Sequence, residues 1–527
     1  MVSVRVRWMV FIVLLTLAGT TRAADAQPVR ATEDDFYRLI SVVTAETTSS
    51  SRSKDWRPGD DGPALEVSGL EVLPNGKVAV AIRKGEIWLL DNVYDDPPSN
   101  VGFHRFATAL HEPLGLLRDG DDAFYTVQRS ELTRVADLDG DQVADEYRTV
   151  AKGWGVTGHY HEYAYGPERD GNGDLWLTLN IGLGLKGEQL KRTVLEPSLG
   201  YRQGRWRGWG MKVSADGKLQ PVCAGMRSPS GLGANVAGDM FYTDQQGNWV
   251  ATNSLHHMRP GAFYHHAEAL ASMNLPGSTI DDVKQVPNGL PYPEALNAFP
   301  QLRPPAVWFP YKKAGQSATD IVLDSSGGKF GPFAGQLFVG EFTQAAIHRV
   351  FLEQVDGEYQ GACFPFRSRF ASAVLRLAQG DDGSLFAGLT NRGWSSLGDA
   401  SYGLQRLVWT GRVPFEMQEV RAEADGFTVR FTKPVDREIA GRTDSWQLSS
   451  HTYLYHSTYG SDEIQKRPLT VQRADVSEDG LSVRLRVAGL RELFVHEIHA
   501  PGVMSMQKES LLHPFAWYTL NRIPHSE

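Results

Sequence analysis

Cysteine is scarce in this chain, with two residues, Cys223 and Cys363, among 527. No CxxCH motif is present, which excludes covalently attached haem of the c type, and no CxxC pair is present to hold zinc. The two cysteines could form one disulfide in an exported protein, or both could be buried thiols. The sequence leaves both alternatives open.

Basic residues are in the minority, with 53 Lys and Arg against 62 Asp and Glu and a formal net charge of -9. The basic residues form no stripe or cluster. Because nucleic-acid affinity comes mostly from clustered Lys and Arg side chains, this balance predicts no nucleic-acid partner.

Long apolar runs are missing after the N-terminus, where no stretch reaches the roughly 18 residues of a membrane-spanning helix. In the first 26 residues, two arginines precede an apolar run from Trp8 to Ala18, and the small-residue pattern Ala24-Asp25-Ala26 follows it. This arrangement is typical of a secretory signal. We therefore expect a secreted or periplasmic protein with no membrane span once the signal is cleaved.

Turn-forming residues are abundant, with 53 Gly and 28 Pro, and they separate short apolar strands. In the stretch 225–249, a Gly238-Asp239 turn precedes the alternating strand Met240–Thr243. Similar strand-turn-strand modules recur with their second strands near residues 78, 124, 175, 240, 337 and 385. Radial repetition of this kind predicts an all-β, six-bladed β-propeller, and a pair of large β-sandwiches is the alternative.

The chain divides into four segments. Residues 1–26 are the expected signal, 27–65 a lead-in with a possible short helix at 34–43, and 66–413 the propeller. Residues 414–527 contain clean period-2 strands at regular intervals, which predict a separate immunoglobulin-like β-sandwich.

The sharpest polar cluster is His159-Tyr160-His161-Glu162. A histidine is the natural base for taking a proton from a hydroxyl, and alternating histidines on an extended segment point to opposite faces, so one of the two should face the axis with Glu162 orienting it. One alternative is a zinc or iron site, formed by His161 with Glu162 or by the pairs His256-His257 and His265-His266. The other is a purely structural hydrogen-bonded loop.

Three arginine or amide groups are candidate clamps for an anionic cofactor. Arg227 lies in a rigid turn before Pro229, where a guanidinium could hold a carboxylate in two parallel bonds. The pairs Gln128-Arg129 and Asn391-Arg392 follow strands of other modules. Salt bridges between blades are the alternative.

Polar residues beside large aromatics suggest contacts with sugar hydroxyls and with the apolar face of a pyranose. The candidates for substrate binding are Asp244, Gln245, Gln246, Asn248, Trp249, Asp320, Glu341 and Trp394. The tryptophans could equally belong to the core between blades.

The run Asp137, Asp139, Asp141 and Asp145 places carboxylates like the first half of a calcium loop. Position 12 is Arg148, so the bidentate Glu of an EF-hand is missing. A small calcium site and a solvated acidic turn both remain possible.

The chain resembles the glucose and sorbosone dehydrogenase family of soluble quinoproteins. The resemblance lies in the histidine loop running into Tyr165-Gly166-Pro167 and then 173–177, and in 225–229 running into Gly231-Leu232. A second resemblance, at 244–249, 326–341, 390–394 and 402–411, is to the membrane-bound-dehydrogenase-type proteins of planctomycetes and their relatives.

The family resemblance implies a six-bladed propeller that binds pyrroloquinoline quinone (PQQ). It also implies that His159 or His161 takes the substrate hydroxyl proton and that Arg227 supports the cofactor. The chain departs from the family pattern where Ser228 follows the arginine and where the histidine cluster replaces a His-Asn-Gly-Gly run.

The sequence therefore favours an exported oxidoreductase of the quinoprotein sugar dehydrogenase type, which oxidises a sugar or polyol hydroxyl and passes electrons to an exported acceptor such as a cytochrome. Two alternatives come from other classes. One is a noncatalytic propeller that binds carbohydrate or a protein partner, and the other is a metal-dependent hydrolase or lyase that uses the cluster from His159 to Glu162.

Overall fold

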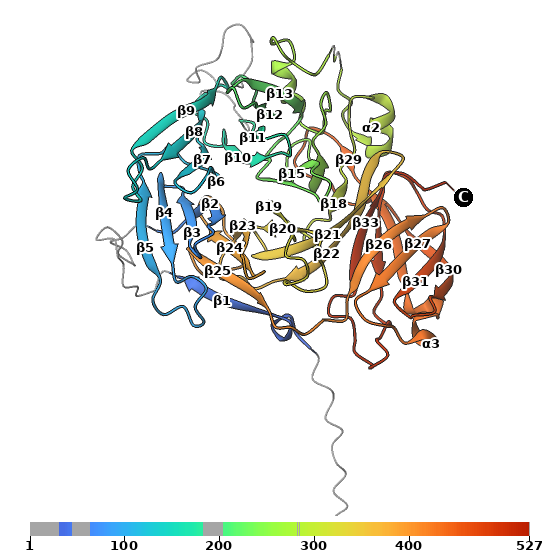
Figure 1. The fold of residues 1–527 in the computed structure, drawn as a ribbon. Helices are drawn as coiled ribbons and strands as arrows, with labels where there is room; N and C mark the ends of the chain where they lie inside the picture. Colours follow the sequence, from blue (N-terminus) through green and yellow to red (C-terminus); the bar gives the residue numbers. More distant parts are fainter. Residues whose placement is uncertain (1–30, 45–63, 183–203, 282, 284, 526–527) are drawn as a thin grey trace, which may run out of the picture. The chain divides into compact units, whose positions relative to one another are not determined.

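The strand-turn-strand modules form sheets arranged around a common axis (Figure 1). The computed structural model describes residues 31–44, 64–182, 204–281, 283 and 285–525. All the elements named below lie in one unit, Thr32–Glu527.

Five sheets have four strands each and form separate blades. They contain β2 (Val67–Val72), β3 (Val78–Ile82), β4 (Glu86–Asp91) and β5 (Gly102–Ala107); β6 (Leu117–Arg118), β7 (Ala123–Val127), β8 (Glu131–Ala136) and β9 (Glu146–Lys152); β10 (Ala164–Arg169), β11 (Leu175–Leu179), β12 (Trp209–Val213) and β13 (Leu219–Ala224); β14 (Gly231–Ala234), β15 (Met240–Asp244), β16 (Asn253–His257) and β18 (Val307–Phe309); and β1 (Tyr37–Val43), β23 (Val374–Gln379), β24 (Leu385–Thr390) and β25 (Tyr402–Trp409).

The remaining sector of the ring belongs to an eleven-stranded sheet. The prediction of six separate blades is therefore wrong, and the structure has five separate blades. This sheet runs in the order β19 (Ala318–Leu323), β20 (Leu337–Glu341), β21 (Ala346–Val355), β22 (Glu358–Arg367), β33 (Phe515–Leu520), β32 (Phe494–His499), β28 (Gln447–Thr452), β30 (Ile464–Val476), β31 (Ser482–Ala488), β27 (Gly426–Phe431) and β26 (Met417–Glu423). The physical reason is that β22 pairs with β33 through Ala362 and Tyr518, so the strands of the fifth module do not end in a free blade edge.

The other described elements are short. They are β17 (Leu290–Pro291), which pairs with β29 (Leu454–Tyr455), the helices α2 (Tyr292–Ala298) and α3 (Arg437–Ala440), and the 3-10 turns η1 (Glu33–Asp35), η2 (Ala267–Ser272) and η3 (Thr443–Ser445). The chain is therefore all-β, with helices confined to connections.

The second strand of each module is the most buried. Every residue of β3, β11, β15, β20 and β24 is buried. A strand covered on both faces needs a continuous apolar run, which is why these segments lack strict alternation. The turn before β15 matches the expected one, since Gly238 adopts φ 83° and donates its N–H to the Asn235 carbonyl.

The helix expected at 34–43 is not found, because Asp34 and Asp35 belong to the 3-10 turn η1 and residues 37–43 form β1. Tyr37 pairs with Trp409 and Leu39 with Leu407, so this N-terminal strand completes the last blade. The partner strand β25 overrides whatever local helix preference the segment has, because pairing satisfies the backbone groups of both strands.

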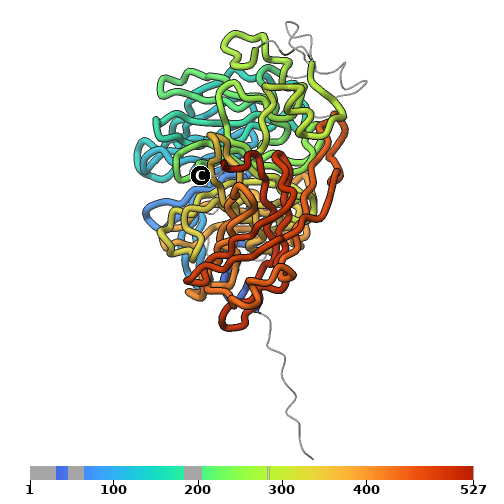
Figure 2. The backbone as a smooth tube through the Cα atoms, turned by 90° about the vertical axis from the view of Figure 1, so that its right-hand side faces the viewer, coloured from blue at the N-terminus to red at the C-terminus, as the bar shows by residue number. Residues whose placement is uncertain are grey.

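The C-terminal strands continue the sheet of β22 along one side of the ring, as Figures 1 and 2 show. The long strand β30 pairs with β28 at its start and with β31 further along, so it joins the two halves of this region. A core of buried residues, including Phe427, Leu485 and Trp446, fills the space between the strands. A separate immunoglobulin-like sandwich is not confirmed, because these strands share one sheet with the fifth module.

Both cysteines are free and buried, which settles the alternatives for Cys223 and Cys363 in favour of thiols. The expected signal at 1–26 lies outside the described residues. Within the described ranges, no helix has the length and apolar character that a membrane span requires.

Candidate functional site

A cavity of about 210 Å³ lies where loops from every sector of the ring meet, and we call it the axial pocket. Its walls come from residues that precede the first strand of a module and from residues that follow the second strand. Six residues expected from the sequence line it: His161, Arg227, Gln245, Gln246, Arg392 and Trp394.

Arg227 lies in the turn before β14 and is 7% exposed. Its guanidinium contacts Ser228 Oγ at 3.4 Å, its Nε has no hydrogen-bond partner, and the Tyr459 ring lies 5.3 Å from its central carbon. Among the described residues, no carboxylate forms an ion pair with it. A Cβ at Gly247 would lie 1.8 Å from Nε, so a larger residue there would displace the guanidinium. The site therefore holds a buried guanidinium with no direct carboxylate partner among the described residues, and the buried Asp244 carboxylate acts on it only through its charge.

Asp244 fixes the turn that carries Arg227 and does not line the pocket. Its buried carboxylate accepts the backbone N–H groups of Arg227 at 2.9 Å, Ser228 at 2.7 Å and Gln245 at 2.9 Å. Burial raises the pKa of Asp244 to about 6. Its role is to position the turn, since its oxygens are used by the backbone.

The histidine loop places His161 on the pocket and His159 outside its lining. Loss of hydration on partial burial, together with the positive charges of His159 and Arg227, lowers the pKa of His161. His161 is therefore neutral at pH 7 and able to accept a proton. Its backbone N–H donates to His159 Nδ1 at 3.1 Å.

Glu162 does not have the orienting role expected of it. The side chain is buried and accepts from the Thr157 backbone N–H at 2.6 Å and from the Thr157 hydroxyl at 2.7 Å. Its carboxylate is thus committed to an adjacent loop and lies outside the pocket lining. This geometry also removes Glu162 as a partner of His161 in a metal site.

Arg129 supports the histidine loop from behind, whereas Gln128 bonds to residues of its own module. Arg129 donates to the carbonyls of Tyr160 at 2.8 Å and of His159 at 3.3 Å, and it pairs with Glu112. The Gln128 amide donates to Thr133 at 2.7 Å. Neither residue lines the axial pocket, so neither is placed to clamp a cofactor.

Arg392 and Trp394 follow β24 and line the pocket, whereas Asn391 does not. Arg392 is exposed and pairs with Glu66 at 2.9 Å. Trp394 is 65% exposed. An exposed, partly neutralised arginine is a weaker anion clamp than the buried Arg227.

Gln245 and Gln246 place side-chain amides in the pocket, donating to the carbonyls of Ala318 at 3.2 Å and Ala251 at 3.1 Å. The next two expected residues contact the C-terminal strands. Asn248 donates to the Ser457 carbonyl at 3.0 Å, and the Trp249 ring lies 5.2 Å from that of Tyr455. They hold a loop against the ring and do not line the pocket.

Asp320 and Glu341 lie outside the axial pocket. Asp320 lines a second cavity, on the other side of Arg376, and lies 3.5 Å from that guanidinium. Arg376 lines that second cavity and donates to the carbonyls of Ser230 at 3.0 Å and Leu114 at 3.2 Å, two residues that line the axial pocket. Glu341 accepts the backbone N–H of Gln316 at 2.6 Å and so fixes the loop beside the pocket.

The acidic turn with Asp137, Asp139, Asp141 and Asp145 belongs to the β8–β9 connection and does not line the axial pocket. Ligand oxygens of Asp137, Asp139 and Asp145 lie within 4.8 Å of one another. Asp137 also accepts the N–H groups of Gly140 at 2.7 Å and Gln142 at 2.8 Å. The carboxylates therefore order the turn themselves.

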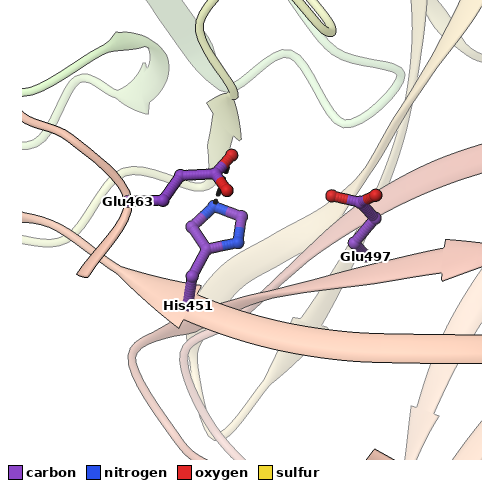
Figure 3. Close-up of side chains that lie close together, drawn as sticks. All are labelled: His451, Glu463 and Glu497. Atoms are coloured by element: carbon purple, nitrogen blue, oxygen red, sulfur yellow. Dashed lines mark ion pairs between the residues drawn. The ribbon is translucent and has the colours of Figure 1, made fainter. Parts of the chain in front are cut away.

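Figure 3 shows another cluster, formed by His451 in β28, Glu463 before β30 and Glu497 in β32. Lys313 Nζ lies 2.7 Å from Glu463 and 2.8 Å from Glu497, so an ammonium group already forms an ion pair with both carboxylates. Burial lowers the pKa of His451 to about 4, which keeps it neutral. Lys313 follows Tyr311, which lines the axial pocket. The cluster thus anchors one pocket wall to the C-terminal sheet.

Several lining residues were not expected from the sequence. Arg83 follows β3, Asn180 follows β11, and Tyr459 comes from the C-terminal region. Arg83 and Asn180 could have been found from their position directly after the second strand of a module. That position lies at the same end of the blade as the loop that enters the first strand. No local signal marks Tyr459, whose place depends on contacts between distant segments.

No family model matches this chain. No curated protein matches it. Solved structures similar to it include an oxidoreductase described as a glucose dehydrogenase from Thermus thermophilus, with 16% identity and a TM-score of 0.47 over 71% of this chain and 100% of the other. A PQQ-bound aldose sugar dehydrogenase from Streptomyces coelicolor has 14% identity and a TM-score of 0.45 over 71% and 98%. The soluble aldose sugar dehydrogenase of Escherichia coli, in its apo form, has 11% identity and a TM-score of 0.45 over 70% and 99%.

Proposed function

We propose that this protein is an oxidoreductase that oxidises a hydroxyl group of a sugar or polyol in the axial pocket, with an anionic quinone such as PQQ as cofactor. The observation that carries the proposal is Arg227, a buried guanidinium without a carboxylate partner, in the same pocket as the neutral His161. A buried unpaired charge is costly unless a ligand of opposite charge compensates it.

The lining residues fit an anionic, oxygen-rich cofactor. Arg227 Nε and Asn180 Oδ1 are buried polar atoms without a partner, one a donor and one an acceptor. Arg227 would hold a cofactor carboxylate, with Arg392 as a second, more exposed cation and Gln245 as an amide donor. When bound, the quinone supplies the two-electron acceptor that the protein's own side chains lack.

His161 is the proposed base. A neutral imidazole takes the proton of the substrate hydroxyl, and the resulting imidazolium is disfavoured by the charges of His159 and Arg227, so the proton is readily released afterwards. The hydrogen bonds of Arg129 to the carbonyls of Tyr160 and His159 hold the loop in place during this transfer. The amides of Gln245 and Gln246 are placed to orient hydroxyl groups.

The proposal extends to location and partners. The signal-like N-terminus supports a secreted or periplasmic site of action, where an exported acceptor such as a cytochrome would take the electrons. Calcium at the acidic turn near Asp137 would be structural, because that turn is not part of the axial pocket.

The test is to titrate the purified full-length protein with PQQ, with and without calcium, while following the quinone absorbance, and then to assay dye reduction with a panel of aldoses and polyols. We expect binding and substrate-dependent reduction. Arg227→Gln should weaken quinone binding by about tenfold or more, because a charged hydrogen bond is lost.

The matched control is Arg473→Gln, a change at an exposed arginine of β30 that pairs with Asp475. It should leave quinone affinity unchanged. Failure of the wild-type protein to bind the quinone would refute the cofactor assignment, and binding that survives Arg227→Gln would refute the role of this residue.

A further inference from the structure

Exposed aromatic side chains gather at the axial pocket. Among the described residues, five Tyr or Trp side chains are strongly exposed, and four of them line this pocket. The four are Tyr160 at 50%, Tyr311 at 38%, Trp394 at 65% and Tyr459 at 61%. They come from the histidine loop, the loop before β19, the segment after β24 and the C-terminal region, and we call them the aromatic rim.

The tyrosines of the rim are held in place although they are exposed. The Tyr160 hydroxyl accepts from Arg83 at 3.1 Å, and that of Tyr311 accepts from Gln316 at 3.2 Å. The Tyr459 ring lies over the Arg227 guanidinium. Rings that are fixed and still exposed lose little side-chain entropy when a ligand covers them.

Tyr459 reaches the rim because its loop is hydrogen-bonded to the loop after β15. The Trp249 N–H donates to the His456 carbonyl at 3.1 Å, and the Gly460 N–H donates to the Gly247 carbonyl at 2.9 Å. A bridge between Asn248 and Tyr459 lies between these two bonds. The C-terminal region therefore completes the mouth of the pocket.

The pocket below the rim combines polar and apolar side chains, and its described lining contains no carboxylate. Amide groups of Asn180, Gln245 and Gln246 offer donors and acceptors that suit hydroxyl groups. Clustered exposed aromatics mark a surface that a ligand covers, and their flat apolar faces match the apolar faces of pyranose rings.

We infer that the site takes an oligosaccharide, with its terminal unit in the axial pocket and further sugar units on the aromatic rim. This inference rests on the proposed function for the identity of the terminal unit as a sugar, and it adds that affinity depends on chain length. A pyranose ring has two faces, so four exposed rings from four segments offer more stacking surfaces than a single sugar unit can use.

The experiment measures binding by isothermal titration calorimetry without added quinone, so that it does not depend on turnover. The probes are glucose and xylose and the hexasaccharides of the cello-, laminari-, malto- and xylo-series. We expect at least one hexasaccharide to bind ten times more tightly than its own monosaccharide.

Trp394→Ala and Tyr459→Ala should each weaken binding of that hexasaccharide at least fivefold, and by a larger factor than they weaken binding of the monosaccharide, because both rings line the pocket and also contact the units beyond it. The matched control is Tyr147→Ala, because Tyr147 is 46% exposed on β9 and does not line the pocket. It should leave both affinities unchanged.

Affinity independent of chain length, or an equal loss in Tyr147→Ala, would overturn the inference, as would the absence of binding to every saccharide. Length-dependent binding in a protein that binds no quinone would uphold the inference and refute the proposed oxidation, leaving a noncatalytic saccharide-binding propeller. Oxidation of monosaccharides together with a binding affinity that does not depend on chain length would uphold the proposed oxidation and refute the inference.

Discussion

At the scale of single residues, the chemistry of the site depends on which polar side chains are already hydrogen-bonded to the backbone. The carboxylate of Asp244 is 17 positions from Arg227 and close to it in space, yet it accepts three backbone N–H groups and not the guanidinium. The Arg227 charge is therefore left for a ligand. In the same way, the Glu162 carboxylate accepts hydrogen bonds from Thr157, so His161 has no carboxylate partner from its own loop.

The two histidines of the loop should differ in their effect on catalysis. His161→Gln should lower the turnover number by about 10²- to 10⁴-fold, because it removes the base, whereas His159→Gln should change it less than about tenfold. Since the pKa of His161 is lowered, the wild-type rate should hold from pH 8 to below pH 6.5 and fall only as the pH drops through that lowered value.

The measurement is the pH profile of dye reduction for the three proteins. His159→Gln should shift the acidic limb upward, because it removes a positive charge that lowers the pKa of His161. A large loss of turnover in His159→Gln with a small loss in His161→Gln would reverse the assignment.

At the scale of elements, the sequence patterns located the strands well because each propeller strand repeats a local requirement. The turn at Gly238 and the apolar runs of β15 and β24 could be predicted from neighbours in the chain. The strand β1 could not, because its partner β25 lies more than 360 positions away. The same limit applies to the site, where His161 and Arg227 belong to recognisable loops but Tyr459 does not.

Arg376 in β23 should be essential for the packing of the innermost strands. It donates to the carbonyls of Ser68, Ser230 and Leu114, which belong to three other sectors, and it is 4% exposed. Arg376→Met leaves these carbonyls without their donor, so the free energy of unfolding should fall by about 3 kcal/mol or more.

Urea denaturation checks this value, with Arg473→Met as the control at an exposed arginine of β30. The control should change the free energy of unfolding by less than about 0.5 kcal/mol. Equal, small effects for both variants would show that the bonds across the axis add nothing to stability.

At the scale of the whole molecule, the C-terminal region and the ring belong to one compact unit. Besides the shared sheet, the Thr519 hydroxyl accepts from the Trp308 backbone N–H at 2.8 Å, and the Asn521 amide donates to the Pro305 carbonyl at 2.8 Å. Trp517 and Tyr453 belong to the same apolar cluster as strands of the ring. Sequence periodicity revealed that the strand pattern changes near residue 414. It did not reveal the shared sheet, because the pairing between β22 and β33 leaves no pattern in the sequence of either strand.

Contacts between the C-terminal region and the rest of the chain also make the free energy of unfolding depend on pH, through His513. This residue, just before β33, lies 2.6 Å from Glu416 and 3.2 Å from Glu33 at the start of the described chain. The two carboxylates outweigh burial and raise the pKa of His513 to about 9. Hydrogen bonds and the His513 charge outweigh the opposing effect of burial and lower the pKa of Glu33 to about 2.

A raised histidine pKa means that the folded state binds the proton more tightly, so the stabilisation is complete below about pH 6.5 and is lost as the pH rises through about 9. The lowered pKa of Glu33 has the opposite sense, so that its contribution is present above about pH 4.5 and is lost as the pH falls through about 2. We expect the ion pair, counted once, to stabilise the fold by about 3 kcal/mol near pH 6.

His513→Gln should therefore reduce the free energy of unfolding by about 3 kcal/mol at pH 6 and have little effect at pH 10, when measured by urea denaturation at both values. The control is His525→Gln, because His525 is 89% exposed and should have no effect at either pH. If the difference between wild type and His513→Gln stays constant from pH 6 to pH 10, the charge of His513 does not join the N-terminal segment to the C-terminal sheet, and apolar packing alone must hold them together.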